Sequence, residues 1–347
     1  MAVASEAAQF GLRPWTEGVS EGLWLGSVAV GVSMSRVVHL NSDEEVPARR
    51  KRFATLDADT SAAAREVETV LERVLPKPHG LHARVHEAMR YAIFAGGKRL
   101  RPFLVLASAG LFGVERSRSL RVAAAIESVH TYSLIHDDLP CMDDDDLRRG
   151  RPTTHVAFDE ATAVLAGDAL LTVAFEILSG RETHPSAEVR CQLIDKLARA
   201  AGSNGMIGGQ MIDMEAENRP LESDDVVLLQ RMKTGALFEF SCEAGPILAE
   251  AGDDDRERLK DNERQFGLIF QITDDLLDAT GSAEKTGKQV GKDEAKGKAT
   301  LVSILGVEGA RAEAGKLANR AVKLLESYDE KAQSLRELPF FLLDRES

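Results

Sequence analysis

Apolar residues from about Ala62 onward recur at three- and four-residue spacing, which predicts a chain that is helical almost throughout. Alanine and leucine are abundant, and the alternating β-branched runs typical of strands are absent. We predict helices over Ser61–Leu75, Val85–Ala95, Arg101–Leu111, Ser119–Asp138, Ala161–Leu178, Ser186–Ala201, Met206–Glu217, Ser223–Glu250, Arg256–Ala279 and Gly309–Tyr328. Loops are predicted where Gly, Pro and charged residues gather, at Pro76–Gly80, Gly96–Lys98, Asp143–His155, Arg181–Pro185 and Gly281–Lys298.

The domain organisation follows from this pattern. No repeat, coiled-coil heptad or change in composition divides the chain after residue 60. We therefore predict an all-α fold, a single large helical bundle over residues 56–347. Residues 1–55 differ in texture from the rest and are predicted to form a poorly ordered N-terminal extension.

Composition narrows the classes of partner. The net charge of -13 argues against nucleic acid, because phosphate backbones select basic surfaces. No stretch is expected to be long and apolar enough to span a bilayer, so no stable membrane insertion is predicted. The three cysteines form an odd number without metal-ligand spacing, which is typical of reduced thiols and favours a cytoplasmic location.

Two aspartate clusters carry the candidate chemistry, one over Asp137–Asp143 and one over Asp274–Asp278. Clustered carboxylates repel one another and are costly to hold together unless a cation lies between them. Mg²⁺ prefers such oxygen ligands and commonly shares its coordination with substrate phosphates. Two clusters predict a cavity in which several Mg²⁺ ions clamp a diphosphate from both sides.

In the second cluster, Asp274 and Asp278 are four residues apart on a predicted helix, so they share one face. Gln271 lies one turn earlier and adds a neutral oxygen or a hydrogen bond. The alternative is a solvated acidic face. Apolar neighbours such as Ile272 and Leu276 disfavour that alternative, because they indicate a largely buried helix.

In the first cluster, Asp137 and Asp143 are six residues apart and would lie on different faces of a regular helix. Pro140 disfavours helical geometry before it, so a widened turn is predicted to bring the two acids together. Arginines 148, 149 and 151 follow and suit the remaining phosphate oxygens. Alternatively, these acids and arginines simply pair with one another.

Four further sites are candidates for phosphate binding, and each also has an explanation without ligand binding. Gly96–Pro102 is a glycine turn that leads into a helix start with cations. Gly287–Asp293, followed by Lys298, is either a ligand loop or an ordinary exposed loop. His130 lies on the face that carries Asp137, where a structural histidine is equally expected. Lys233-Thr234-Gly235 indicates either a kink directed at a ligand or flexibility without function.

These motifs resemble a known family. Ser133–Gly150, Phe270–Asp278 and Gly96–Pro102 are similar to three ordered motifs of the trans-isoprenyl diphosphate synthases, and most closely to those of their bacterial farnesyl-producing members. The resemblance covers the chain from about Ala62 and implies the isoprenoid synthase type of bundle, with a central active-site cavity. It also implies joining of an allylic diphosphate to isopentenyl diphosphate, and a homodimer.

The resemblance implies roles for individual residues. Asp137, Asp143 and Asp274 would ligate Mg²⁺, three ions with substrate bound, while Asp138 and Asp278 would orient ligands or waters. The allylic diphosphate would be held by Arg148, Lys233, Thr234, Gln271, Lys288 and Lys298. Isopentenyl diphosphate would be held without metal by Lys98, Arg101, His130 and Arg149. Asp137, Asp143, Asp274, Arg148 and Lys233 would form the catalytic set.

Product length is predicted from Tyr132, which lies five residues and roughly 7.5 Å before Asp137 along the helix. In the resembling family an aromatic residue here goes with a fifteen-carbon product, and Ser133 beside it is small. Farnesyl diphosphate is therefore the expected product, with a geranylgeranyl or geranyl product as alternatives. A class I terpene cyclase and a non-catalytic synthase subunit are disfavoured, because both aspartate motifs are present.

Overall fold

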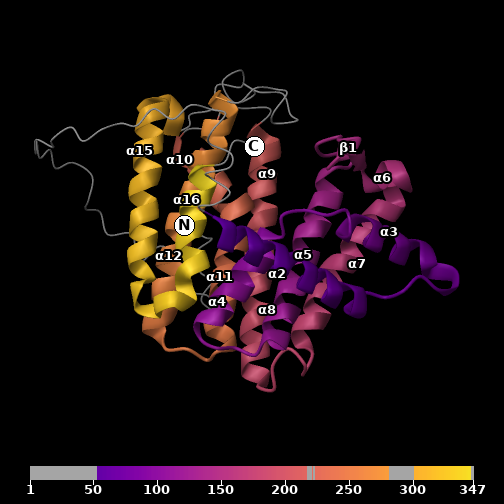
Figure 1. Ribbon diagram of the computed structural model, residues 1–347. Coiled ribbons are helices and arrows are strands. Elements are labelled where there is room, and N and C mark those ends of the chain that lie inside the picture. Colours follow the sequence, from indigo (N-terminus) through magenta and orange to yellow (C-terminus); the bar gives the residue numbers. More distant parts are fainter. Residues whose placement is uncertain (1–52, 217–220, 222, 281–300, 345–347) are drawn as a thin grey trace, which may run out of the picture. The chain divides into compact units, whose positions relative to one another are not determined.

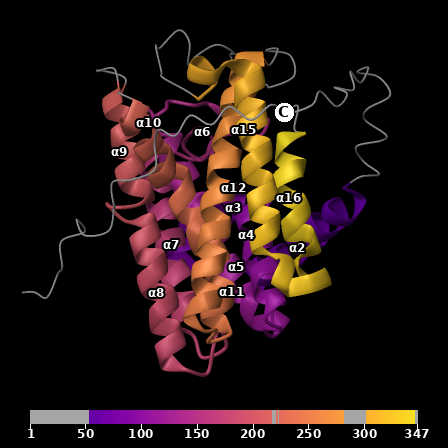
Figure 2. The ribbon, with the colours of Figure 1, turned by 90° about the vertical axis from the view of Figure 1, so that its left-hand side faces the viewer.

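The structure is a computed structural model that describes residues 53–216, 221, 223–280 and 301–344. These all belong to one compact unit, Pro47–Ser347. The described elements are helices that lie side by side in a bundle, with one short β-hairpin between α5 and α6 (Figures 1 and 2). They are α2 (Ala54–Val74), η2 (Gly80–His82), α3 (Ala83–Ile93), α4 (Leu100–Leu111), α5 (Arg116–Asp137), β1 (Leu147–Arg148), β2 (Arg151–Pro152), α6 (Thr154–Ala157), α7 (Glu160–Ser179), α8 (Ala187–Ala201), α9 (Met206–Ala216), α10 (Ser223–Gln230), η3 (Arg231–Gly235), α11 (Ala236–Leu248), α12 (Asp253–Thr280), α15 (Leu301–Leu324), η4 (Glu326–Ala332) and α16 (Gln333–Leu343).

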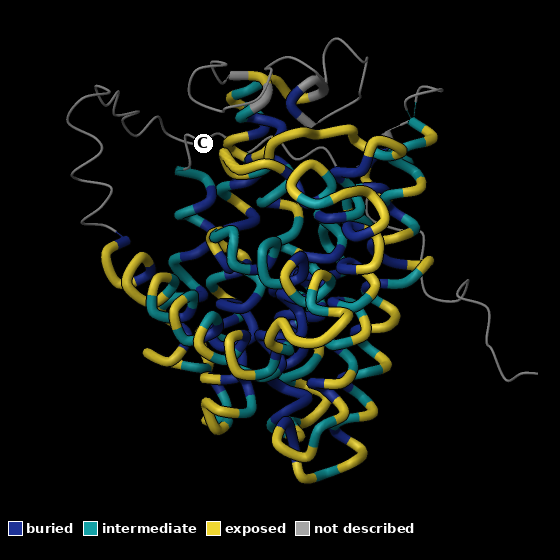
Figure 3. The backbone as a smooth tube through the Cα atoms, turned by 90° about the vertical axis from the view of Figure 1, so that its right-hand side faces the viewer, coloured by how far each residue is buried: buried dark blue, intermediate teal, exposed yellow. Residues whose placement is uncertain are grey.

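Helix α5 is the centre of the bundle. Five consecutive residues, Val122 to Ile126, have no solvent exposure, which a helix with one covered face cannot achieve. Helices α2, α3, α4, α7 and α11 all contact it. Buried positions therefore occur on every side of α5, whereas the outer helices are exposed on one side (Figure 3). The central helix is also the one that ends at the first aspartate motif.

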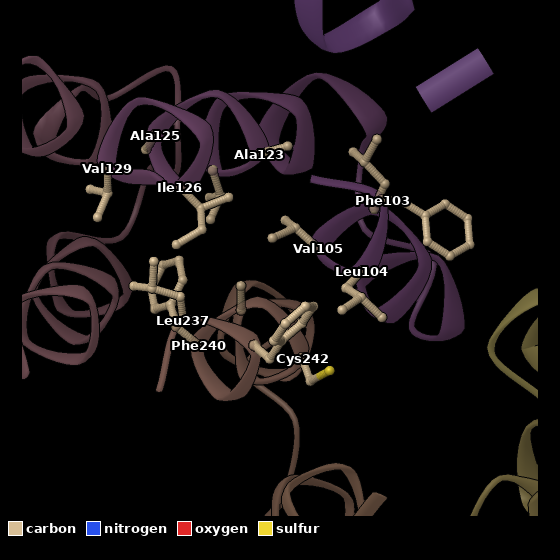
Figure 4. Packing of buried hydrophobic residues seen from close by; sticks show 14 of the residues in the cluster. Phe103, Leu104, Val105, Ala123, Ala125, Ile126, Val129, Leu237, Phe240 and Cys242 are labelled. Atoms are coloured by element: carbon tan, nitrogen blue, oxygen red, sulfur yellow. The ribbon is translucent and has the colours of Figure 1, made fainter. Parts of the chain in front are cut away.

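Helices α4 and α11 approach each other very closely. A Cβ placed on Gly245 would lie 2.4 Å from the backbone carbon of Ser108, so only glycine fits there. The Ser108 hydroxyl also lies 3.3 Å from the Ser241 carbonyl oxygen. Apolar side chains of α4, α5 and α11 fill the space between these helices (Figure 4). This packing fixes the helices that carry the candidate site.

The all-α prediction is confirmed, and most predicted helices agree with the structure within a few residues. The helix predicted over Ser223–Glu250 is interrupted by the π-helical segment η3, Arg231–Gly235, which includes the Lys233-Thr234-Gly235 stretch where the sequence indicates a kink or flexibility. Helix α16 is not among the predicted helices, and Pro339 lies within it. The loop predicted over Asp143–His155 contains the hairpin β1–β2. The predicted extension over residues 1–55 lies almost entirely outside the described residues and stays a prediction.

The expectation that no segment has the length and hydropathy of a membrane span is wrong. Helix α7 is 20 residues long and contains a window with mean hydropathy 1.7. The helix packs along α5, and Ala163, Ala166, Leu170 and Ala174 are fully buried there. A core helix meets the same criteria of length and composition. Its remaining apolar residues include Val164 and Leu165, which are 39% and 57% exposed.

Glu263 of α12 gives a prediction about pH and stability. It is 4% exposed, and burial together with Glu239 and Glu243 raises its pKa to about 8. The folded chain therefore keeps this proton to higher pH than the unfolded chain, so stability falls as pH rises from about 4.5 to about 8. We expect Glu263→Gln to be more stable than the wild type by on the order of 3 kcal/mol at alkaline pH.

Urea unfolding on both sides of this pH window measures the effect. The advantage of Glu263→Gln should disappear below the ordinary carboxyl pKa, because the wild-type side chain is then protonated in both the folded and the unfolded state. Glu257→Gln, an exposed position on the same helix, is the matched control and should change little at either pH. An equal difference at acid and alkaline pH would contradict this account.

Candidate active site

The first aspartate motif begins where α5 ends. Asp137 is the last helical residue, and the chain then turns through Asp138 to Asp144. The Asp143 amide donates to the Asp137 carbonyl oxygen over 2.8 Å, and the Asp144 amide donates to the Leu139 carbonyl oxygen over 3.2 Å. This widened turn carries Asp143 back beside Asp137, as the position of Pro140 predicts.

The electrostatics of the two acids agree with this proximity. Burial raises the pKa of Asp137 to about 6, with Lys233 lowering it and Asp143 raising it. Burial also raises the pKa of Asp143, again opposed by Lys233 and supported by the nearby Asp213. The turn therefore holds carboxylates that resist ionisation, which is the situation a bound cation relieves. Several oxygen donors crowded in this way fit Mg²⁺.

Asp138 and Arg148 form an ion pair beside this turn. Asp138 is buried, and its two carboxylate oxygens lie 2.7 and 2.9 Å from the Arg148 Nε. The Arg148 guanidinium also approaches Asp145 at 3.9 Å. The alternative in which acids and arginines of the motif pair with one another therefore holds for Arg148. The pair anchors the hairpin β1–β2 to the end of α5.

Arg149 is placed by the turn of that hairpin. Arg149 and Gly150 have φ values of 54° and 75°, which is the pattern of a two-residue type I′ turn. The Arg149 guanidinium lies where a side chain of residue 97 would stand, within 2.5 Å of a Cβ built on Gly97. Gly97 therefore leaves room for an arginine from a segment far along the sequence.

A basic cluster surrounds His130. The Arg101 guanidinium lies 3.4 Å from the His130 Nε2 and 4.6 Å from the centre of the Phe238 ring. Burial lowers the pKa of His130 well below its usual range, and Arg101 and Arg149 lower it further. Burial also lowers the pKa of Arg101 to about 10. The structure thus brings together Arg101, His130 and Arg149, while Lys98 is exposed on the adjoining loop.

Arg99 supports this cluster from within the core. Arg99 is the residue before α4 and has a φ of 48°. Its guanidinium donates to the Glu127 carboxylate over 2.5 Å and to the Ile93 carbonyl oxygen over 2.5 Å. Both side chains of the Arg99–Glu127 pair are at most 3% exposed. The pair ties the glycine turn before α4 to α5.

Lys233 reaches the first motif from η3, a π-helical segment of the kind often found at functional sites. Its ammonium donates to Asp213 of α9 over 2.6 Å. Gly209 allows this approach, because a Cβ there would lie 2.2 Å from the Lys233 amide nitrogen. Thr234 is half-buried beside it.

Two residues of α9 were missed by sequence reasoning. Asp213 pairs with Lys233, and both polar atoms of the Gln210 amide are buried without a hydrogen-bond partner among the described residues. The available signal was a pair of polar residues in an apolar stretch, three apart and preceded by Gly208 and Gly209. Because neither residue belongs to a cluster, this signal is weak without the fold.

The second motif lies on α12, which contacts η3 and α11. Ile272 and Leu276 are buried, so the helix is largely covered, as predicted. Asp274 is exposed, and the Gln271 amide donates to Asp275 over 3.1 Å. Opposition of Asp274 to Asp137 across one cavity stays a prediction. The side chains of Asp278, Lys288 and Lys298 lie outside the described residues.

Tyr132 lies on α5, five residues before Asp137. Its ring packs edge-on against His136 at 5.6 Å, and its hydroxyl is buried with no hydrogen-bond partner among the described residues. Burial and the charge of Asp137 raise the pKa of Tyr132 to about 12. The adjacent Ser133 hydroxyl donates to the His130 carbonyl oxygen over 2.9 Å.

The chain is similar to known proteins over most of its length. The polyprenyl synthetase family pattern matches residues 82–338. The chain belongs to the polyprenyl synthetase family. A farnesyl diphosphate synthase of Bacillus subtilis is 50% identical over 226 residues, 65% of this chain and 76% of the relative. Geranylgeranyl pyrophosphate synthase 4 of Arabidopsis thaliana is 41% identical over 288 residues, 81% of this chain and 76% of the relative.

A solved structure supports the same assignment. An FPP/GFPP synthase from Zymomonas mobilis has a TM-score of 0.76 and 46% identity, covering 84% of this chain and 99% of that one. The resemblance inferred from the motifs is confirmed, and the chain is a prenyltransferase of the trans-prenyl diphosphate synthase type. Members of the family generally use Mg²⁺. Farnesyl and geranylgeranyl diphosphate synthases are both among the relatives of this chain, so family membership does not fix product length.

Proposed function

We propose that this chain condenses dimethylallyl or geranyl diphosphate with isopentenyl diphosphate, head to tail, and releases farnesyl diphosphate. The observation that carries the proposal is Tyr132, a buried ring one and a half turns before Asp137 on the central helix. A hydrocarbon tail that starts at the acids and runs along α5 meets this ring early.

Asp137, Asp143 and Asp274 are the proposed Mg²⁺ ligands. Bound Mg²⁺ would neutralise the charge that develops on the departing diphosphate. The structure supports the part played by Asp137 and Asp143, since the turn holds both acids together with raised pKa values. In this proposal Asp138 orients Arg148 through their ion pair, and Arg148 holds the allylic diphosphate.

The remaining proposed contacts to the allylic diphosphate come from cations and polar groups near these acids. Lys233 lies within electrostatic reach of Asp137 and Asp143, so its ammonium is available to the diphosphate at the same place. Asp213 keeps this ammonium in position. Thr234 and Gln271, together with Lys288 and Lys298 from the loop outside the described residues, complete the proposed set.

Isopentenyl diphosphate is proposed to bind at the basic cluster. Arg101 and Arg149 stay cationic, while the lowered pKa of His130 keeps its ring neutral, so the histidine acts as a hydrogen-bond partner. Lys98 adds a positive charge at the exposed edge. This cluster is basic and the first motif acidic, which supports a metal-free site beside a metal-dependent one. After the new carbon–carbon bond forms, the carbon next to the resulting carbocation loses a proton to the departing diphosphate in this proposal, and the new double bond forms there.

Product analysis of the purified full chain tests the function. With Mg²⁺, isopentenyl diphosphate and dimethylallyl diphosphate, we expect a fifteen-carbon diphosphate as the final product. A final product of twenty carbons or more would show that the chain makes geranylgeranyl diphosphate or a longer product instead of farnesyl diphosphate. With geranyl or farnesyl diphosphate as the only substrate, cyclised hydrocarbons would indicate a terpene cyclase, and no turnover of either substrate mixture would indicate a non-catalytic subunit.

Substitution of Tyr132 tests the product-length argument. Tyr132→Ala and Tyr132→Met remove the ring, so the tail has room to grow and we expect a major share of twenty-carbon product. Tyr132→Phe is the matched control, because it keeps the ring and removes only the unpartnered hydroxyl. Product chain length by mass spectrometry is the measurement. Unchanged length in Tyr132→Ala would remove Tyr132 from the argument.

We also propose that the chain forms a homodimer through the outward side of α7. The outward side of this helix carries the exposed apolar residues Val164 and Leu165 beside the acidic Asp168, and Val156 on the neighbouring α6 is also exposed. Apolar side chains that gather on an exposed face mark an interaction surface, and a second copy supplies the cover. Sedimentation equilibrium tests this, and a monomer at micromolar concentration would contradict it.

A further inference from the structure

Three histidines converge on the connection between α2 and α3, far from the aspartate motifs in sequence. His79 precedes η2, His82 immediately precedes α3, and His86 lies one turn into α3. One ligand nitrogen from each ring lies within 4.8 Å of those of the other two. The ring centres are 4.9 to 5.6 Å apart. His79 and His82 are exposed and His86 is half-buried, so solvent ions reach the cluster.

The backbone fixes which nitrogens are free to bind a metal. The Nδ1 of His79 lies 2.8 Å and the Nδ1 of His86 3.2 Å from the same carbonyl oxygen, that of Lys77. A carbonyl oxygen only accepts hydrogen bonds, so each Nδ1 carries the proton and each neutral ring leaves its Nε2 lone pair unprotonated. A backbone carbonyl that receives Nδ1–H is the usual support of a metal-binding histidine.

The carbonyl itself is held by the local sequence. Lys77 lies between Pro76 and Pro78, and each proline fixes its own φ while Pro78 keeps Lys77 extended. The orientation of two of the three rings is therefore set before any ion binds. Such preorganisation reduces the entropy lost on binding.

The spacing also suits a tetrahedral ion. His82 and His86 are four residues apart and share one face of the first turn of α3, with the His-x₃-His spacing found in zinc sites. Ligand nitrogens around zinc lie about 3.4 Å from one another, given bonds of roughly 2.05 Å. The nitrogens that lie within 4.8 Å of one another, one from each ring, would need to approach by at most about 1.4 Å, and rotation of the rings would direct each Nε2 to the ion.

We propose that His79, His82 and His86 form a site for a divalent transition metal ion, with a fourth position left for water or an external ligand. Three imidazole ligands favour Zn²⁺ and its neighbours over Mg²⁺, which prefers oxygen. The bound ion would link the proline-rich connection after α2 to the first turn of α3. This histidine site is separate from the Mg²⁺ site proposed at the aspartate motifs.

Zinc binding to the full chain tests this site. In equilibrium dialysis with Mg²⁺ in large excess to occupy the aspartates, we expect one Zn²⁺ per chain. The variant His82→Gln/His86→Gln should bind Zn²⁺ at least about a hundredfold more weakly, since two of the three ligands are lost. His155→Gln, which changes a histidine outside the cluster, should bind like the wild type. Wild-type affinity in the double variant would overturn the proposal.

Two further measurements keep the result specific. Condensation with Mg²⁺ alone should be unchanged in the double variant, because these side chains lie outside the proposed substrate sites. With Co²⁺, nitrogen and oxygen ligands give only weak ligand-field absorption, whereas the exposed thiols of Cys141 and Cys191 would add strong sulfur-to-metal absorption. A sulfur band that disappears in Cys141→Ser or Cys191→Ser would place the metal on a thiol and overturn the histidine site.

Discussion

Replacing Asp143 by asparagine is expected to lower kcat for condensation by about a hundred- to a thousandfold. The change removes a charge at the point where the turn after α5 brings Asp143 to Asp137. Loss of one preorganised electrostatic contact to the leaving group has an effect of roughly this size. Steady-state rates at saturating substrate, measured over a range of Mg²⁺ concentrations, are the observable. The Mg²⁺ requirement should rise together with the loss of rate.

Asp144→Asn is the matched control, with the same chemical change one residue later. Asp144 is exposed and has a φ of 53°, a conformation that asparagine adopts readily. We therefore expect near-wild-type rate and stability from this variant. Equal losses in Asp143→Asn and Asp144→Asn would mean that only the total charge of the segment matters, which would contradict the specific role of Asp143.

Local sequence signals were sufficient for the helices and for the first motif. The apolar spacing of residues 119–138 predicts α5 nearly to its ends. Pro140 predicts the turn that follows, because its effect on the preceding residue is local and steric. The turn also brings Asp143 beside Asp137, and the backbone hydrogen bond from the Asp143 amide to the Asp137 carbonyl oxygen shows this.

Contacts between distant segments were not predictable in the same way. The glycine pair before α4 predicts a phosphate turn, but no local signal indicates that the Arg149 guanidinium lies against Gly97. The sequence leaves open whether Arg148 pairs with an acid of its own motif; the structure shows this pairing with Asp138, and contact of Arg148 with substrate stays a prediction. Asp213 shows the limit most clearly, since its partner Lys233 is 20 residues away on another element. Pairings of this kind depend on how helices pack, which periodicity does not encode.

The two halves of the candidate site have opposite electrostatic character for a shared structural reason. The end of α5 carries the acids, and earlier turns of the same helix carry His130 and Glu127. The hairpin after the acids returns two arginines, one to each half: Arg148 to Asp138 and Arg149 to the glycine turn. One rigid central helix therefore sets the spacing between the proposed diphosphate sites. Changes that loosen α5 against α4 should affect both halves together.

Breaking the Arg99–Glu127 pair is therefore expected to have the largest effect on stability. Arg99→Met leaves the Glu127 carboxylate buried without its main partner, at an expected loss of about 3–5 kcal/mol in the free energy of unfolding. The double variant Arg99→Met/Glu127→Leu removes both charges and should recover much of that loss. Urea unfolding of the two single variants and the double variant gives the coupling energy of the pair directly.

An exposed pair of the same residue types supplies the comparison. Arg116 and Glu66 also form a two-point contact, at 2.9 and 3.0 Å, but their side chains are 49% and 40% exposed. Arg116→Met should therefore cost less than about 1 kcal/mol, because water replaces the lost partner. If Arg99→Met were no more destabilising than Arg116→Met, burial would not be the source of the effect, and Arg99 would not anchor the glycine turn to α5.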